Sequence, residues 1–297
     1  MALPKFEVST YDIKLPISQL DVKYRPYLVK EEKNLMIANE TGEQKDVINA
    51  VKNLIENCTN NTIKSGVIPM ADLEYLFVNI RAKSSGETTK VSIKCPDEEN
   101  TYVTKEINLT DLTVDKPLPD SNLVRLDDKI AIEFRYPSID DLSHLKDFKN
   151  PTMDDLFQII INCVHRVIDG EKVYEKTDFN EKESKEFVES LSSNQFNKVR
   201  KFFDNIPKLY KDVEVNNPNT NVSSKVRLEG LNSFFYIALS HDTLENHFKT
   251  NFAMMQHHKY SVIELENMVP WEREIYVGLL NEHIREENER LKQQQNT

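Results

Sequence analysis

The sequence predicts an α+β protein with two lobes. Short alternating runs of apolar and polar residues indicate strands in an N-terminal lobe of short strands and helices, residues 1–137. Apolar residues recurring every three or four positions predict a mainly helical C-terminal lobe, residues 138–297, with a β-hairpin insertion near 209–228. Glycine is scarce, at 6 residues, and no Gly-rich phosphate-binding loop is found.

The N-terminal lobe begins with two short strands. The stretch "YDIKLPISQLDVKYRPYL" alternates around a Pro-Ile-Ser break, which places Val22 and Tyr24 on one strand face. After Pro26 the spacing becomes helical, and Glu31 and Glu32 fall in the first turn, where acidic groups favour a helix N-terminus. Two more helices, a hairpin from "TTKVSIKC" and "TYVTKEINL", and a strand in "KIAIEFRY" are expected to follow.

The C-terminal lobe opens with two capping boxes. "SIDD" and "TMDD" both have a hydroxyl residue followed three positions later by an acid, and the second predicts a helix whose apolar face runs to Val167. "FNKVRKFFDNIP" predicts another helix, and "LYKDVEV" and "KVRLEGL" flank an Asn- and Pro-rich turn that predicts the hairpin. The rest is expected to be helical, and no internal repeat is found.

Overall charge and cysteine usage narrow the class of protein. The chain has 38 basic and 49 acidic residues, a net charge of −11, which disfavours nucleic acid as a partner. No segment has the apolar length of a membrane span, and "MALPKFEVST" lacks the apolar run of a secretory signal. The odd number of widely spaced cysteines, 3, predicts reduced thiols, so we expect a soluble intracellular protein.

Catalytic and metal-binding motifs are not found. The histidines have no HExxH or familiar ligand spacing, and no GxSxG nucleophile motif occurs. Cys58 and Cys163 lie on apolar helix faces, whereas Cys95 ends a strand and could be half exposed. We therefore predict no catalytic residues, no cofactor and no metal.

The chain's only tryptophan lies in "HKYSVIELENMVPWEREIYVGLL". Ser261 and Glu264 form a capping box, and Pro270 fits the first turn of the next helix. Glu272 and Glu274 are then explained by the helix dipole and by solvation, as are the charges beside them. This pattern predicts that Trp271 is an aromatic anchor, buried in the core or docked on a partner, at the start of a helix.

Several blocks resemble the baseplate hub proteins of T-even-type contractile-tailed phages. They are the "LPK" start, "YRPYLVKEEK" at 24–33, the helix ending at Cys58, "DLEYLFVNIRAKSSGE" at 72–87, "LEGLNSFF" and "PWEREIY". Members of this family often carry paired cysteines in their hairpins, and here "KCPDEEN" retains one, which agrees with the prediction of no metal.

The resemblance implies a structural or assembly component of the central hub, not an enzyme. Its implied partners are other baseplate hub and tail proteins, met in the host cytoplasm during assembly or in the virion tail baseplate. A hub-associated cell-wall hydrolase and an assembly chaperone that leaves the virion are the alternatives. Tyr24, Arg25, Tyr27 and Trp271 are the candidate partner contacts; oligomeric state is left open.

Overall fold

The computed structural model describes residues 9–115, 122–143 and 152–295, and its mixture of helices and small antiparallel sheets confirms the predicted α+β class. The helices are α1 Val29–Thr41, α2 Gln44–Cys58, α3 Met70–Ser85, α4 Ile139–Leu142, α5 Met153–Cys163, α6 Glu181–Glu189, α7 Ser193–Asp204, α8 Leu231–Leu239, α9 Leu244–His258, α10 Val262–Glu266 and α11 Pro270–Gln295. The strands are β1 Tyr11–Lys14, β2 Asp21–Tyr24, β3 Thr88–Lys94, β4 Tyr102–Asn108, β5 Thr113–Val114, β6 Leu123–Arg125, β7 Ile130–Phe134, β8 Val164–Asp169, β9 Lys172–Glu175, β10 Leu209–Asn216 and β11 Ser223–Glu229.

The first hydrophobic cluster is built on α1, α2 and α3. The β1–β2 hairpin covers it, and β2 turns Val22 and Tyr24 inward as its alternation predicts. Buried Asp72 on α3 fixes the hairpin turn, because its carboxylate accepts the backbone N–H groups of Ile17 and Ser18, both at 2.7 Å. The β1–β2 hairpin is thus held against the helix layer by its buried side chains and by the carboxylate of Asp72.

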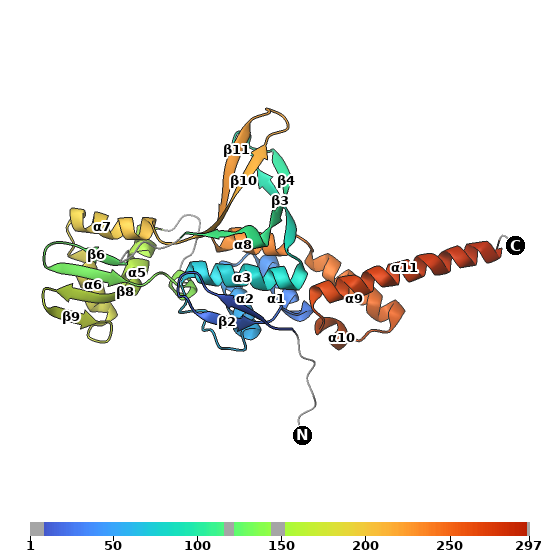
Figure 1. Cartoon of the computed structure of the whole chain (residues 1–297), viewed down its shortest axis with the longest axis horizontal. Helices are drawn as coiled ribbons and strands as arrows, with labels where there is room; N and C mark the ends of the chain where they lie inside the picture. The colour runs from blue at the N-terminus through green and yellow to red at the C-terminus, as the bar shows by residue number, and fades with distance from the viewer. Residues whose placement is uncertain (1–8, 116–121, 144–151, 296–297) are drawn as a thin grey trace, which may run out of the picture.

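Two long hairpins rise together from this layer (Figure 1). One is β3–β4, and the other is β10–β11, which confirms the hairpin expected near 209–228. The hairpins meet near their tips, where buried Asn217 donates to both carboxylate oxygens of Asp97 at 3.1 Å. Segments more than a hundred residues apart are joined in this way.

The second hydrophobic cluster fills the opposite end of the molecule from α11 (Figure 1). Its four-stranded sheet, ordered β6-β7-β8-β9, packs with α5, α6 and α7. The helix expected to continue to Val167 ends at Cys163, and this part of the prediction was wrong. Val164–Asp169 is a strand paired with β7 and β9, and Gly170 turns the chain with φ +58°. Val164 and Val167 match the spacing of either element, which explains the error.

The boundary expected between residues 137 and 138 stays a prediction. The two hydrophobic clusters divide the chain differently, because β7 on one side of that position pairs with β8 on the other. The buried residues of the second cluster run from Val124 to Phe202, and the first cluster takes residues from before and after this stretch, together with Ile139 within it.

The chain after β11 is helical, as expected. Helices α9, α10 and α11, which we call the C-terminal arm, follow α8, and α11 extends away from the body so that the C-terminus lies at its far end (Figure 1). Within the described ranges, no helix is both long and apolar enough to cross a bilayer.

Candidate functional site

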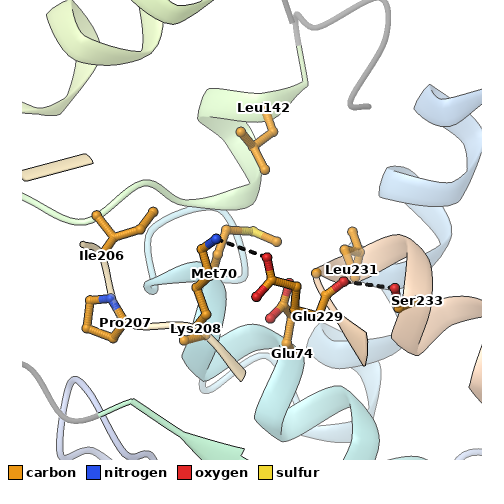
Figure 2. A pocket seen from close by; sticks show the side chains of 11 residues that line it. Met70, Glu74, Leu142, Ile206, Pro207, Lys208, Glu229, Leu231 and Ser233 are labelled. Carbon is orange, nitrogen blue, oxygen red and sulfur yellow. Dashed lines mark hydrogen bonds and ion pairs between the residues drawn. The ribbon is translucent and has the colours of Figure 1, made fainter. Parts of the chain in front are cut away.

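A pocket of about 410 Å³ lies where α3, α4, β11 and α8 come together (Figure 2). Its lining residues are Met70, Ala71, Glu74, Leu142, Ile206, Pro207, Lys208, Glu229, Gly230, Leu231 and Ser233. Most of these side chains are apolar, and the charged groups gather where Glu74, Lys208 and Glu229 meet. The pocket is therefore an apolar hollow with one charged end.

Local chain geometry brings these elements together. Met70 begins α3, and its backbone N–H donates to the carbonyl of Pro137 at 3.0 Å, which joins the start of α3 to the start of α4. Gly230 has φ +82°, a conformation that glycine adopts readily, and it turns the chain from β11 directly into α8. The pocket thus forms between segments that are distant in the sequence.

Glu74 is the unusual group in the pocket. Its side chain lies on α3 and is only 5% exposed, yet it makes no hydrogen bond or ion pair with any residue that the structure describes. Burial, and secondarily the negative charge of Glu229, raises the pKa of Glu74 to about 8, although Lys208 opposes this. The ammonium group of Lys208 is held by Glu229 at 3.1 Å. The neutral form of Glu74 is therefore favoured at neutral pH.

Three of the predicted partner contacts are part of the protein's own structure. Tyr24 and Tyr27 are buried in the first cluster, so neither offers a surface to a partner in this fold. Arg25 makes a two-pronged ion pair with Glu31, at 2.7 and 2.8 Å, and also donates to the carbonyl of Pro26. In this fold, their burial and pairing stabilise the protein's own structure, and contact with a partner stays a prediction.

The Arg25 turn occurs a second time in the molecule, at Arg135. Each arginine follows a strand and pairs through two nitrogens with the carboxylate six residues later. Its backbone N–H donates to the carbonyl of a helix-ending cysteine at 2.9 Å. The carboxylates are Glu31 and Asp141, and the cysteines are Cys58 and Cys163. The two turns share a pattern of contacts with little sequence similarity, so the expectation that the sequence has no internal repeat stays a prediction.

Trp271, unlike Tyr24 and Tyr27, is exposed to solvent. It is 43% exposed on the first turn of α11, so the structure excludes a fully buried core position for its ring. Ile275 and Leu279 follow it at helical spacing and are 55% and 58% exposed. We call these three side chains the outer stripe. They form an uncovered apolar face on the C-terminal arm.

A buried polar network fixes the base of α11. Arg273 was expected among the solvated charges, but it is buried and bonds to the ring of His247 at 3.1 Å and to the Asn251 carbonyl oxygen at 3.2 Å. Asp242 and Glu32 lie 3.5 and 3.8 Å from its guanidinium group. Burial, followed by the positive charge of Arg273, lowers the pKa of His247. The network joins α11 to α9 and α1.

Cysteines and histidines do not gather into a ligand set in the described ranges. Cys58, Cys95 and Cys163 are all free and buried, so the expectation that Cys95 is half exposed was wrong. Burial raises the pKa of Cys163 to about 12, because a thiolate is poorly solvated there. No group of three or more possible metal ligands is found within those same ranges, and the absence of a metal stays a prediction.

Comparison with known protein families shows the family to which the chain belongs. The model of the T4 bacteriophage base plate protein family matches residues 8–236. The chain belongs to this family. The expected resemblance to T4-like baseplate proteins is thereby confirmed over residues 8–236, which include the second hydrophobic cluster and both long hairpins. The "LPK" and "PWEREIY" blocks lie outside the match, and "LPK" also lies outside the described residues. No curated protein and no solved structure matches the chain.

Family membership makes this chain a baseplate protein of a T4-like phage. The match ends at residue 236, before the C-terminal arm begins at Leu244. Both the pocket and the repeated arginine turns lie within the matched region, whereas the outer stripe lies beyond it. Sequence reasoning found the stripe from its helical spacing, but it missed Glu74, whose only signal is an acid inside a helix that is otherwise apolar on most sides.

Proposed function

We propose that this baseplate protein is a structural or assembly component of the central hub and that it binds other hub and tail proteins through its C-terminal arm. Among the described residues, eleven of the twenty-one exposed large apolar side chains lie between Phe248 and Leu291. Exposed apolar surface of this density is typical of protein–protein interaction sites. This concentration is the observation that carries the proposal.

The outer stripe indicates the kind of partner. One residue turns a helix by about 100°, so Trp271, Ile275 and Leu279 share a face over roughly 12 Å, and Glu282, Glu286 and Glu289 continue the same face. Arg285 lies 3.8 Å from Glu282 and moderates the charge of that carboxylate. The face fits an apolar groove with basic residues at one end, and a tryptophan at its first turn is a common binding hot spot.

The two alternative functions, a cell-wall hydrolase and a chaperone that leaves the virion, require different structural features. A cell-wall hydrolase of the glycosidase type needs two carboxylates across a substrate cleft. Glu74 and Glu229 both line the pocket, but Glu229 is held by Lys208, and both belong to the same charged end (Figure 2). A chaperone that leaves the virion would use the same outer stripe, and it differs from a resident hub protein only in its absence from finished tails.

Alanine substitution of the outer stripe tests the proposal. We expect Trp271→Ala to weaken binding to hub proteins by at least about 2 kcal/mol, because the ring is available to a partner. The free energy of unfolding should change by less than about 1 kcal/mol, because the ring is already partly solvated. Co-purification from infected cells, urea unfolding and phage assembly measure these effects.

Tyr102→Ala provides the matched control, since Tyr102 is a comparably exposed aromatic residue on the β4 hairpin. It should leave binding and assembly unchanged. Glu272→Gln and Glu274→Gln should have only small effects, about 0.3 to 1 kcal/mol each on stability. Assembly lost only in these two variants would favour an active-site role and contradict the proposal. Mass spectrometry of purified tails distinguishes a resident component from a departing chaperone.

A further inference from the structure

We propose that the pocket between α3 and α8 binds a lysine or arginine side chain presented by another protein, with Glu74 as its counterion. This inference goes beyond the proposed hub role, because it concerns a surface separate from the outer stripe. The pocket would hold a ligand with an apolar stem that ends in a cationic group.

The walls of the pocket fit such a stem. Met70, Leu142, Ile206, Pro207 and Leu231 contribute apolar side chains around the hollow (Figure 2). Lysine and arginine both carry several methylene groups that pack along apolar surface while the charged head reaches a polar partner. A ligand entering along these side chains would bring its head to the end occupied by Glu74 and Glu229.

Glu74 lacks the partner that the other buried carboxylates have. Within the described ranges, Glu31, Glu32, Asp72 and Asp141 are each buried and hydrogen-bonded, whereas Glu74 has no hydrogen bond or ion pair. A buried carboxyl group without a partner is costly, so native proteins usually pair such groups. The pocket is open space next to this unpaired group.

The charges at the polar end select a cation. Lys208 is the basic residue among those lining the pocket, and its ammonium group is already bound to Glu229. An anionic ligand would be repelled by Glu229, and a purely apolar ligand would leave Glu74 without a hydrogen-bond partner. A lysine or arginine head would satisfy both carboxylate oxygens of Glu74 through charge-assisted hydrogen bonds.

Binding should release a proton. Glu74 is protonated at neutral pH because burial raises its pKa to about 8, and an incoming cation favours its charged form. The charged groups acting on Glu74 are Glu229 and Lys208. Affinity for a cationic ligand should therefore increase by roughly 20-fold between about pH 6.5 and about pH 8.5.

NMR titration of the full chain with three small probes tests the inference. The probes are the N-acetyl methylamides of lysine, arginine and norleucine, the last of which has the apolar stem without the charge. We expect the lysine or arginine probe to shift the amide signals of Met70, Glu74 and Leu231, and to bind at least about tenfold more tightly than norleucine. The ratio between the lysine and arginine probes identifies which head the pocket prefers.

Glu74→Gln keeps the size of the side chain and removes its ability to ionise. It should weaken binding of the cationic probes at least about tenfold and abolish the pH dependence, whereas the exposed control Glu99→Gln should change neither. Equal binding of norleucine, or no perturbation of these signals by any probe, would overturn the inference. The probe titration uses the wild-type protein and does not involve the outer stripe. A negative titration would therefore overturn the pocket inference without bearing on the hub proposal.

Discussion

The turns that begin α1 and α4 use the same ion pair in different surroundings. Arg25 and Glu31 lie against the first hydrophobic cluster, with side chains 18% and 8% exposed, whereas Arg135 in the second turn is 40% exposed. The α4 turn also has a hydroxyl cap, since Ser138 donates to Asp141 at 2.8 Å, and the α1 turn has Leu28 at that position. Since the arginine is shared and the hydroxyl is not, the arginine is the common means of fixing the helix start.

Glu74 extends the comparison to a buried carboxylate that has no arginine. Hydrogen bonds from Arg135 and Ser138 outweigh burial, which alone would raise the pKa of Asp141, and the net pKa falls below its usual value. For Glu74, burial is not opposed by any hydrogen bond, and its pKa rises. Of two carboxyl groups with similarly low exposure, the one that accepts hydrogen bonds from an arginine stays charged, and the one without such a partner becomes neutral.

The largest expected effect is that of Arg25→Met. The substitution leaves Glu31 buried without its cation and with the backbone N–H of Leu28 as its remaining partner, so we expect the free energy of unfolding to fall by about 3 to 5 kcal/mol, measured by urea denaturation. Arg200→Met is the control, because Arg200 and Asp204 form a pair that is mostly exposed on α7. It should change stability by less than about 1 kcal/mol. Equal losses for these two variants would show that burial of the ion pair is not decisive.

Arg135→Met should cost less, about 2 to 3 kcal/mol by the same measurement, because Asp141 keeps its hydrogen bonds from Ser138. The loss should also depend on pH. Because the pKa of Asp141 is lower in the folded protein than in the unfolded chain, its ionised form stabilises the fold above the unfolded-state pKa. This stabilisation is lost as the pH falls through the folded-state pKa. The difference between wild type and variant should therefore shrink in acid. A loss as large as that of Arg25→Met would remove the distinction between the two turns.

Glu74→Gln should stabilise the unliganded protein, with the opposite pH dependence. Below the unfolded-state pKa of about 4.5, Glu74 is protonated in both the folded and unfolded states and does not destabilise the fold. As the pH rises toward about 8, the unfolded chain ionises this group more readily than the folded protein does, so the wild-type fold loses stability. We expect the variant to match wild type near pH 4.5 and to be the more stable of the two near pH 9. Thermal unfolding across this range measures the difference. A variant less stable than wild type at high pH would indicate a partner for Glu74 within the chain.

The smallest expected effect is that of Ser138→Ala, about 1 kcal/mol, the usual value for losing a capping hydroxyl. Chemical denaturation of the single variant and of its combination with Arg135→Met measures the coupling between cap and ion pair. If Ser138→Ala costs more than Arg135→Met, the hydroxyl and not the arginine fixes the start of α4, and the analogy with the α1 turn fails.

Much of the fold could be predicted because it depends on local sequence. The β10–β11 hairpin and the capping boxes at Ser138 and Thr152 follow from turn residues and short spacings, and the structure has them. The β8–β9 hairpin was missed because its first two apolar residues continue a helical spacing. The arginine turns, the burial of Arg273 and the isolation of Glu74 depend on contacts between distant segments, which one sequence does not reveal.

The anchored base of α11 has a mechanical consequence. At about 1.5 Å per residue, its 26 residues form a rod of roughly 39 Å. Arg273 bonds its first turn to α9 and α1, and the ring of Tyr276 lies beside that of Tyr260. A rotation of a few degrees at that base displaces the far end by about 2 to 3 Å, comparable to the radius of a side chain. The rod is thus a lever, and small rearrangements around Arg273 are magnified at its tip.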